Sequence, residues 1–466
     1  MGIQLSMKHS SWFNSVLPIA AIFSFRMLGL FMLIPVFTVF AAHLQGATPA
    51  LIGLALGSYG LSQGLLQMPF GMLSDRYGRK PLLTIGLLLF ASGSLIGALS
   101  HSIYMMILAR TLQGTGAIGS VLIALLADLT PDEQRTKAMA VIGMTIGLSF
   151  SLAMVISPAI THHYGLPGIF YLTTGMAFLG LFLLHGVIPT PKRERFHIDS
   201  EATPSLFKAV IHNKHLQRLN MGIFFQHFIL TATFYAIPMM LQEQLKQGHL
   251  THQWHFYLPL MIFAFIFMVP FILLAEKKRQ MKPVFIGSVL VTSLTQFLLA
   301  FSNQYWLSLF ALMLAYFLAF NILEASLPSL VSKQADANSK GTAMGIYSSS
   351  QFLGIFAGGA LAGLLYQWAG DKGIFLTNGL LALLWLFISF SMQPDAYLST
   401  LIVNYPANLK RGEDELIQHL KKLPGIKEIM LAPEEKVIYC RLDKAIYQGG
   451  SIEKVLQQLA TPNGSK

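Results

Sequence analysis

Apolar runs of about 20 residues recur throughout the first 394 positions of this chain. A helix of that length crosses the ~30 Å hydrocarbon core of a bilayer at about 1.5 Å per residue. Only 11% of the residues are charged, against about 25% in soluble domains, so buried helices of a large soluble protein do not explain the runs. We therefore predict an all-α membrane protein with twelve spans, at 13–40, 51–73, 81–99, 103–128, 137–160, 168–188, 218–242, 253–275, 283–301, 304–330, 342–368 and 373–393.

The distribution of lysine and arginine predicts the orientation of these spans. Eighteen of these residues lie in the segments on one side of the membrane, whereas the other side carries only Lys246 and Lys372. Because cytoplasmic loops are enriched in Lys and Arg, we expect both termini in the cytoplasm of a multi-pass protein of the cell membrane, the inner membrane in a Gram-negative source. The net charge of +11 follows from this topology and gives no reason to expect nucleic-acid binding.

Two polar breaks divide the chain. The first, residues 189–217, is basic and contains prolines, and it separates a six-span half at 1–188 from a second at 218–394. Its stretch "SLFKAVIHNKHL" suits a helix on the membrane surface and an ordinary cytoplasmic linker about equally. The second break introduces a soluble domain at 395–466, where charges balance and hydrophobicity alternates.

The soluble domain has a β-α-β-β-α order. The stretches "YLSTLIVNY", "GIKEIMLA" and "KVIYCRLD" are typical of strands, and "GEDELIQHLKKL" and "SIEKVLQQL" of helices. This order predicts a small α+β domain of the ferredoxin-like type, whose last strand is missing or very short. The domain lacks a C-x-x-C motif and the chain has a single cysteine, Cys440. We therefore expect no metal site and no cofactor.

Short internal similarities relate the two halves. "RTKAMAVIG", from Arg135, leads into the fifth span, and "KGTAMGIYS", from Lys340, leads into the eleventh. A Lys-Pro pair likewise opens the third span at Lys80 and the ninth at Lys282. Parallel duplicated halves are an architecture of membrane transporters.

The stretch "GMLSDRYGRK", residues 71–80, lies between the second and third spans. Gly71 would let two helices approach closely, and Gly78 would permit a tight turn. Asp75 would pair with a neighbouring cation or lie at the N-terminal end of another helix. Contacts of this kind would hold a cytoplasmic gate shut reversibly, whereas the topology signal alone accounts for Lys80.

This stretch resembles the signature loop of the major facilitator superfamily, G-x-x-x-D-R-x-G-R-K. The matching positions are Gly71, Asp75, Arg76, Gly78, Arg79 and Lys80. "RTLQGTGAIG", from Arg110, resembles the family's R-x-x-x-G-x-G motif, and "GLSFSLAMVISPAI" resembles its antiporter motif in part. There Pro158 is present, but Ser157 stands where a glycine is usual. The whole chain, including its added domain, is similar to the YajR-type bacterial transporters.

The resemblance implies a twelve-helix fold in two six-helix halves and proton-driven efflux of drugs or small molecules. It also implies roles at the signature loop. The acid at Asp75 would cap the start of the eleventh span in the outward-open state, and Arg79 would pair with an acid at the end of the fourth span, Asp128.

Three charged residues, Arg26, Arg110 and Glu324, lie well inside predicted spans and not at their ends. Burying an ion at bilayer depth costs at least about 2.5 to 3.5 kcal/mol, so such residues usually face a cavity and serve function. We expect all three to face the cavity between the halves; for Arg110, a structural role in holding helices together is the alternative. Glu324 is the one acid deep within a span and is our candidate for proton coupling; a structural ion pair with an arginine is the alternative.

Four polar residues are further candidates for the cavity wall: Gln113, Gln226, His227 and Asn321. His227 could relay protons, although a lone histidine in a helix is more often a hydrogen-bonded packing residue.

Three classes of function compete. Secondary active export, with a small molecule, protons and the bilayer as partners, fits best. A membrane enzyme is not supported, because the sequence has no nucleophile elbow, zinc motif or paired acids at membrane depth. It also has no G-x-x-x-x-G-K-[ST] loop, so direct drive by ATP within this chain is not supported either. A transporter-derived sensor that signals through residues 395–466 is the alternative. The substrate, the direction of transport and the oligomeric state are not determined by the sequence.

Overall fold

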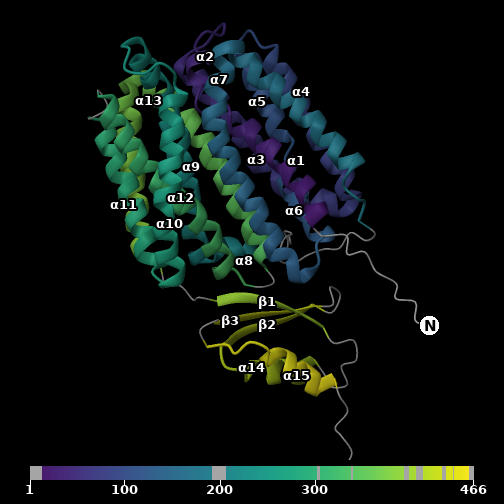
Figure 1. Ribbon diagram of the computed structural model, residues 1–466. Coiled ribbons are helices and arrows are strands. Elements are labelled where there is room, and N and C mark those ends of the chain that lie inside the picture. The colour runs from purple at the N-terminus through teal and green to yellow at the C-terminus, as the bar shows by residue number, and fades with distance from the viewer. Residues whose placement is uncertain are drawn as a thin grey trace, which may run out of the picture.

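Long apolar helices stand side by side above a small β-sheet (Figure 1). We call the end of the bundle next to the sheet the lower end and the opposite end the upper end. The computed structural model describes residues 13–191, 206–301, 305–336, 339–392, 398–405, 413–432, 437–443 and 446–460.

The first half comprises α1 to α7. Two of its spans are interrupted, since α1 is followed by the short helix α2, and α6 follows α5 after a three-residue gap. The helices are α1 (Phe13–Phe31), α2 (Phe37–Ala41), α3 (Pro49–Tyr77), α4 (Arg79–Ala98), α5 (Ile103–Thr115), α6 (Gly119–Leu129) and α7 (Asp132–Gly186).

The second half comprises α9 to α13 and is preceded by α8, a short helix at the lower end (Figure 1). The helices are α8 (Phe207–His212), α9 (Lys214–Lys246), α10 (Trp254–Lys277), α11 (Met281–Leu299), α12 (Trp306–Gln334) and α13 (Lys340–Phe390). α8 falls within the stretch for which we considered a surface helix, but residues 192–205 of the linker lie outside the described part of the chain.

The twelve-span prediction is confirmed. Within the described residues, eight helical segments are long and apolar enough to cross a membrane, with α5 and α6 taken together. Non-helical backbone at Gly165 divides α7 into two spans, and Gly370 divides α13 in the same way. α1 with α2 and α3 supply the remaining two.

Equivalent positions in the two halves have equivalent geometry. Gly165 has φ +64° and Gly370 has φ +63°, a left-handed conformation that glycine adopts without strain. Lys80 Nζ donates to the carbonyl of Ile188 at 2.7 Å, just beyond the sixth span. Lys282 Nζ donates in the same way to the carbonyls of Phe390, the last residue of α13, and of Met392, just beyond it. The lysines of the duplicated Lys-Pro pairs therefore connect the third span to the sixth in the first half, and the ninth span to the twelfth in the second half.

The signature stretch is more helical than a loop. α3 continues to Tyr77 and α4 begins at Arg79, so that only Gly78 is non-helical, with φ +95°. A side chain would be strained at this φ. The expected turn is therefore a single residue, which fixes the direction of α4 relative to α3.

The C-terminal domain has the predicted order of elements. β1 (Leu398–Asn404), α14 (Glu413–Lys421), β2 (Ile426–Ala432), β3 (Val437–Asp443) and α15 (Ser451–Ala460) follow one another. The strands form an antiparallel sheet in the order β1-β3-β2. Leu416, Leu420 and Ile452 of the two helices pack on one face of the sheet with Ile438 and Cys440.

Large apolar side chains cover the sides of the bundle. On α10, for example, Ile262, Ile266 and Phe267 are exposed. A surface of this kind is stable only against hydrocarbon. The chain is a multi-pass membrane protein.

Candidate functional site

The two halves are in close contact at the upper end. A Cβ added at Gly53 on α3 would lie 2.3 Å from the carbonyl oxygen of Gly359 on α13, and one at Gly363 would lie 2.2 Å from that of Pro49. A side chain at either position would collide with backbone. The glycines thus allow the second and eleventh spans to pack backbone against backbone.

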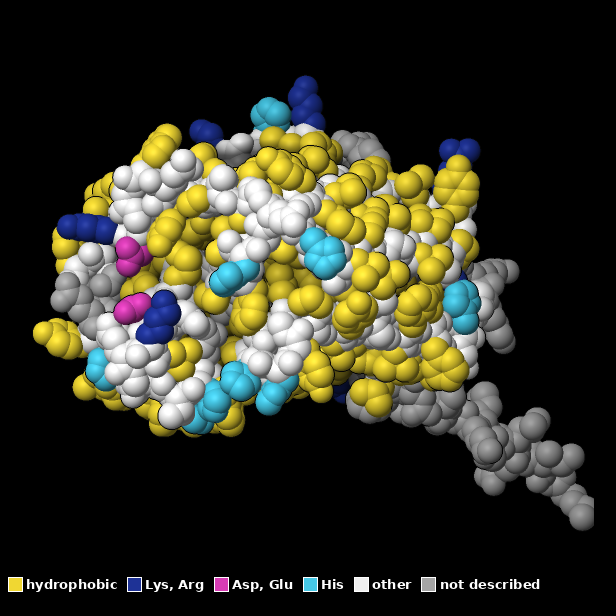
Figure 2. Space-filling model, turned by 90° about the horizontal axis from the view of Figure 1, so that it is seen from above, with side chains coloured by type: hydrophobic (Ala, Val, Ile, Leu, Met, Phe, Trp, Pro, Cys, Tyr) yellow, Lys and Arg dark blue, Asp and Glu magenta, His cyan; other side chains and the backbone are white. Residues whose placement is uncertain are grey.

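Further contacts support this closure. Tyr235 Oη on α9 donates to the carbonyl of Pro49 at 2.9 Å. The rings of His162 on α7 and His252, which precedes α10, lie 5.3 Å apart. Histidines are prominent on the upper face (Figure 2). Residues of both halves thus close the upper end together.

A small cavity of about 80 Å³ separates the halves nearer the lower end. Residues of the first half that line it include Gln67, Gly71, Asp75, Arg79 and Ser120, and those of the second half are Gly341, Met344, Gly345 and Ser348. The signature stretch therefore faces the start of the eleventh span across a space.

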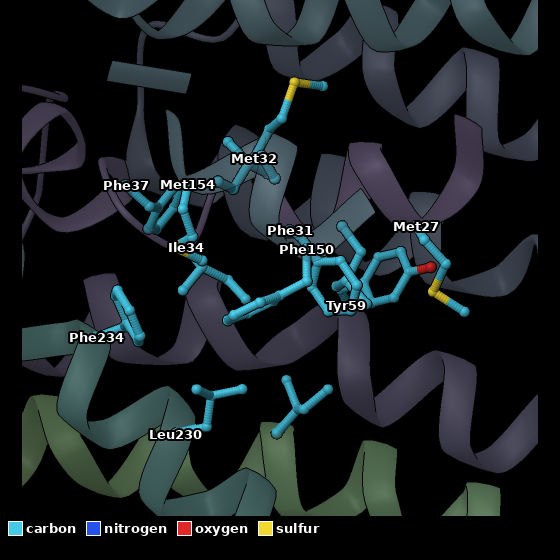
Figure 3. Packing of buried hydrophobic residues seen from close by; sticks show 14 of the residues in the cluster. Met27, Phe31, Met32, Ile34, Phe37, Tyr59, Phe150, Met154, Leu230 and Phe234 are labelled. Atoms are coloured by element: carbon cyan, nitrogen blue, oxygen red, sulfur yellow. The ribbon is translucent and has the colours of Figure 1, made fainter. Parts of the chain in front are cut away.

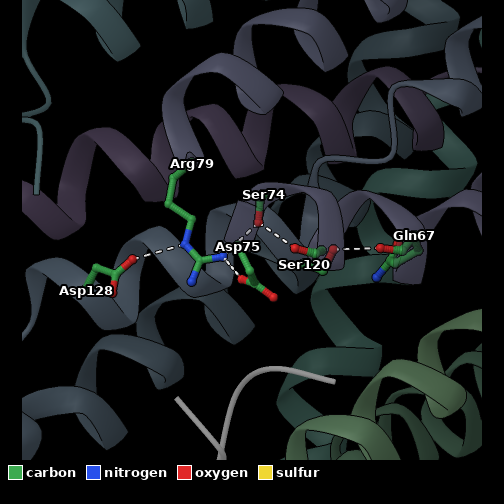
Figure 4. A network of polar contacts seen from close by, with 7 residues as sticks. Gln67, Ser74, Asp75, Arg79, Ser120 and Asp128 are labelled. Carbon is green, nitrogen blue, oxygen red and sulfur yellow. Dashed lines mark hydrogen bonds and ion pairs between the residues drawn. The ribbon is translucent and has the colours of Figure 1, made fainter. Parts of the chain in front are cut away.

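A polar cluster connects the signature stretch to the fourth span (Figure 4). Arg79 Nε donates to Asp128 Oδ2 at 3.1 Å, and its Nη1 donates to Ser74 Oγ at 2.7 Å and to a carboxylate oxygen of Asp75. The side chains of Arg79 and Asp128 are 1% and 0% exposed, whereas that of Asp75 is 30% exposed. The guanidinium is thus held between one buried and one accessible carboxylate.

The other members of the signature stretch have simpler surroundings. Arg76 is exposed, with its guanidinium carbon 5.4 Å from the ring centre of Tyr77. A Cβ at Gly71 would lie 3.3 Å from Ser120 Oγ, so a larger residue would crowd α6. Ser120 Oγ in turn donates to the carbonyl of Gln67 at 2.8 Å.

Glu324, on α12, lies in a second polar cluster formed by the second half alone. Gln226 Nε2 donates to Glu324 Oε2 at 2.9 Å, and Gln351 Nε2 lies 3.4 Å from Oε1. Gln351 Nε2 is also 2.8 Å from His227 Nε2, which is 3.8 Å from Glu324 Oε2. The side chain of Glu324 is 31% exposed. No Lys or Arg of the described residues pairs with it, which disfavours the structural ion pair with an arginine.

Arg110 lies inside the first half and not across from the second. Its guanidinium carbon is 4.9 Å from the ring centre of Tyr59, and Nη1 donates to Gln113 Oε1 at 2.8 Å. Gln113 Nε2 continues to Ser94 Oγ on α4. A Cβ at Gly114 would lie 2.1 Å from Ser62 Oγ. The R-x-x-x-G-x-G segment is therefore a packing and hydrogen-bonding site among α3, α4 and α5.

Arg26 and Asn321 are also buried. Arg26, on α1, has its guanidinium carbon 6.0 Å from the ring centre of Phe352 on α13, so it lies where the halves meet. Its Nε and Nη2 have no hydrogen-bond partner among the described residues, and neither has Nδ2 of Asn321.

Aromatic rings from both halves pack against one another where the halves meet. Phe150 on α7 stacks on Phe320 of α12 with ring centres 5.8 Å apart, and it also contacts Phe31 and Phe317. Figure 3 shows Phe31 and Phe150 together with Tyr59 and Met27. This part of the interface is therefore apolar.

Ser157, the departure from the antiporter motif, has a structural explanation. Its hydroxyl donates to the carbonyl of Met32, where α1 has ended and the first span is interrupted. A glycine could not satisfy this buried carbonyl.

Comparison with known proteins agrees with this architecture. A family model described as Major Facilitator Superfamily matches residues 19–359 and 219–404. The chain belongs to the major facilitator superfamily. Members of this superfamily are transporters, so the chain falls in a class of membrane transporters and not of enzymes.

Relatives within the superfamily include the inner membrane transport protein YajR of Escherichia coli (strain K12). It is 42% identical over 441 residues, which are 94% of this chain and 96% of that protein. The quinolone resistance protein NorA of Staphylococcus aureus (strain COL) is 24% identical over 76% of this chain and 90% of its own length.

A solved structure of the superfamily has the same fold. The xylose transporter XylE from E. coli, in a partially occluded inward-open conformation, superposes with a TM-score of 0.65 at 16% sequence identity. The match covers 84% of this chain and 99% of that one.

Sequence reasoning did not select several of the residues in these clusters. The residues that it missed are small or amide-bearing, lie in apolar helices and belong to no motif of their own: Gln67, Ser74, Ser120 and Gln351. The pair Gln63 and Gln67, which are four residues apart and hydrogen-bonded at 2.5 Å, offered the clearest signal. Among the described residues, no group of three or more His, Cys, Asp or Glu could hold a metal ion.

Proposed function

We propose that the chain exports a small molecule by alternating access, driven by protons. The moving bodies are residues 1–188 and 218–394, joined by the linker 189–217, and residues 395–466 form the attached domain. The lower end is cytoplasmic in this proposal, because basic loop residues such as Lys277, Lys278 and Arg279 gather there.

The surroundings of Glu324 are the main support for this proposal. It is a carboxylate within a span, partly accessible, held by two amides and not neutralised by Lys or Arg among the described residues. A membrane-embedded acid in this setting is expensive unless it serves function. Protonation would remove its charge and change its hydrogen bonds to Gln226 and Gln351, which is the step that couples a proton to movement of the second half.

The cluster around Arg79 serves as the gate at the cytoplasmic end. Asp75 lines the cavity together with Gly341 at the start of the eleventh span. In the opposite conformation this cavity closes and Asp75 approaches the N-terminal end of α13, where a carboxylate is stabilised by the helix dipole. Gly71 and Gly78 permit the approach, and Arg76 and Lys80 keep the stretch on the cytoplasmic side.

The experiment is uptake into inside-out proteoliposomes with an imposed pH gradient, acidic inside, over a panel of drug-like compounds. We expect accumulation of at least one compound by the wild type, and a loss of at least about tenfold in Glu324→Gln, corresponding to about 1.4 kcal/mol. Equal melting temperatures of the two purified proteins would exclude a folding defect. Unchanged gradient-driven flux in Glu324→Gln would remove this residue from the mechanism.

A sensor function is the second candidate, and one contact favours it. Arg279, between α10 and α11, places Nη2 3.4 Å from Oδ1 of Asp443 in β3. Arg279 has φ +56°, an unusual value for a residue other than glycine. The contact connects the C-terminal domain to the second half. Deleting residues 395–466 distinguishes the two functions, because an exporter retains gradient-driven flux and a sensor loses its output while showing no flux at all.

A further inference from the structure

The fourth span is interrupted inside the bundle. α5 ends at Thr115 and α6 begins at Gly119, with no side chain capping its start. Within the described part of the chain, the amides of Gly119, Ser120 and Val121 have no backbone acceptor. The first amides of a helix carry a partial positive charge, and such half-helix ends at membrane depth are suited to anions.

A buried cation stands at the same place. Arg26 is 2% exposed, and its Nε and Nη2 have no partner among the described residues. Its Nη1 lies 3.0 Å from the position that a Cβ of Gly119 would occupy, and the amide atoms of Gln67 lie 3.6 Å from the same point. A guanidinium beside the positive end of a helix, with donors unused, is unfavourable unless an anion neutralises both.

The surroundings of this anion position are apolar. The Arg26 guanidinium carbon is 6.0 Å from the ring centre of Phe352, and the neighbouring Met27 lies with Phe31, Tyr59 and Phe150 in the interface core (Figure 3). Gln67, on the other side, lines the cavity at the lower end. A ligand entering from that cavity would therefore meet donors at one end of the site and aromatic rings at the other.

We propose that Arg26 and the N-terminal end of α6 bind the carboxylate of an organic anion whose apolar body packs on the aromatic residues between the halves. This inference rests on the proposed function, because it names the class of molecule that is transported. Arg26 supplies a forked pair of donors that matches a carboxylate. Gly119 leaves the helix end open, since a side chain there would occupy the space beside the guanidinium.

The test uses the purified full-length protein and three aromatic carboxylates: benzoate, 2-naphthoate and anthracene-9-carboxylate, each compared with its neutral amide. Equilibrium binding is measured by the change in tryptophan fluorescence and by thermal stabilisation. We expect at least one carboxylate to bind roughly tenfold to hundredfold more tightly than its amide, as for a hydrogen-bonded charge. Equal binding of acid and amide throughout would overturn the proposal.

Two variants test whether the preference for the carboxylate over the amide depends on Arg26 and the start of α6. Arg26→Gln removes the cation, and Gly119→Val keeps it but fills the helix end; each should reduce the preference for the carboxylate to within about twofold while amide binding persists. Arg26→Lys keeps the positive charge but lacks the paired donors of the guanidinium, and it should retain part of the preference for the carboxylate. Lys246→Gln, at an exposed position on the upper end of α9, is the matched control and should retain all of it. A preference that survives both Arg26→Gln and Gly119→Val would contradict the assignment.

Competition identifies the source of the anionic group. Chloride or phosphate that displaces 2-naphthoate at equal concentration would indicate an inorganic-anion site and contradict the organic ligand. The same panel in proteoliposomes separates this inference from the proposed function. Export of neutral compounds without any preference for carboxylates would refute this inference alone, whereas an absence of gradient-driven flux for every compound would refute the proposed function.

Discussion

Arg79 and Asp128 form an ion pair, Nε to Oδ2 at 3.1 Å, that is almost inaccessible to solvent. It connects the start of the third span to the end of the fourth, both in the first half. Asp75 contacts the same guanidinium from the cavity side and is 30% exposed. The two carboxylates thus differ in environment: Asp128 stabilises the first half internally, and Asp75 faces the second half.

This difference predicts separate effects for two conservative variants. Asp128→Asn removes the buried carboxylate of the Arg79 guanidinium and leaves it with the partly exposed Asp75; breaking a buried pair costs about 3 to 5 kcal/mol. Asp75→Asn removes a partly exposed charge and should cost less than about 1 kcal/mol. The measurement is the apparent melting temperature of each purified variant in detergent, together with accessibility of lower-end cysteines to a maleimide.

We expect Asp128→Asn to lower the melting temperature clearly and Asp75→Asn mainly to change the accessibility. Arg76→Gln, which alters an exposed member of the same stretch, is the control for the melting temperature. Equal melting temperatures for all three variants would contradict the conclusion that Asp128 stabilises the first half.

The glycine contacts at the upper end predict a position-dependent effect of added volume. Gly53→Val would place Cβ within 2.3 Å of the Gly359 carbonyl, so the halves must separate there. Overpacking of this kind costs about 1 to 3 kcal/mol and should populate a state open at the upper end. Cysteines at upper-end interface positions should then react faster with a membrane-impermeant maleimide.

Gly143→Val on α7 provides the matched control, because no heavy atom lies within 4 Å of the Cβ it would add. This variant should behave like the wild type. A Gly53→Val protein with unaltered upper-end reactivity would show that the α3–α13 contact does not restrict opening.

Cys440 predicts a pH dependence of the C-terminal domain. Burial raises the pKa of its thiol from 9.0 to about 12, so the folded domain keeps the proton that the unfolded chain loses. The stabilising contribution is therefore complete below about pH 9 and is lost as pH rises from about 9 towards 12. Maleimide labelling of this single cysteine in the folded protein at pH 8 should be at least about a hundredfold slower than in urea.

Cys440→Ala should flatten the loss of domain stability between pH 9 and pH 11, measured by urea titration of β-sheet circular dichroism. Rapid labelling of the native wild-type protein would mean that this strand is not buried in solution.

The fold could be predicted largely from the sequence because its determinants are local. An apolar run of sufficient length specifies a span whatever surrounds it. The Lys-Pro repeats at Lys80 and Lys282 indicated two related halves, and the structure adds that each lysine binds the end of the last span in its half. The β-α-β-β-α order was likewise predicted from local patterns: hydrophobic residues alternate in the strands and recur at helical spacing in the helices.

The polar clusters could be predicted only in part, because they depend on contacts between distant residues. The pairing of Arg79 with Asp128 was implied by family resemblance and is present. Arg110, which we expected to face the cavity, instead bonds Gln113 and contacts Tyr59 within its own half. Nothing local distinguishes a charge that faces a partner helix from one that faces a cavity. For the same reason, the role of Gln351 beside Glu324 and His227 became visible only in three dimensions.

Alternating access is tested most directly by distances across the two ends of the bundle. In a Cys440→Ser background, spin labels at Gln45→Cys with Trp368→Cys report on the upper end, and labels at Tyr77→Cys with Lys278→Cys report on the lower end; all four positions are exposed. Pulsed electron paramagnetic resonance at pH 5 and pH 8 would measure both pairs. The account predicts two populations in which the upper distance lengthens as the lower one shortens. A single pH-independent distance for each pair, or a simultaneous lengthening of both, would contradict it.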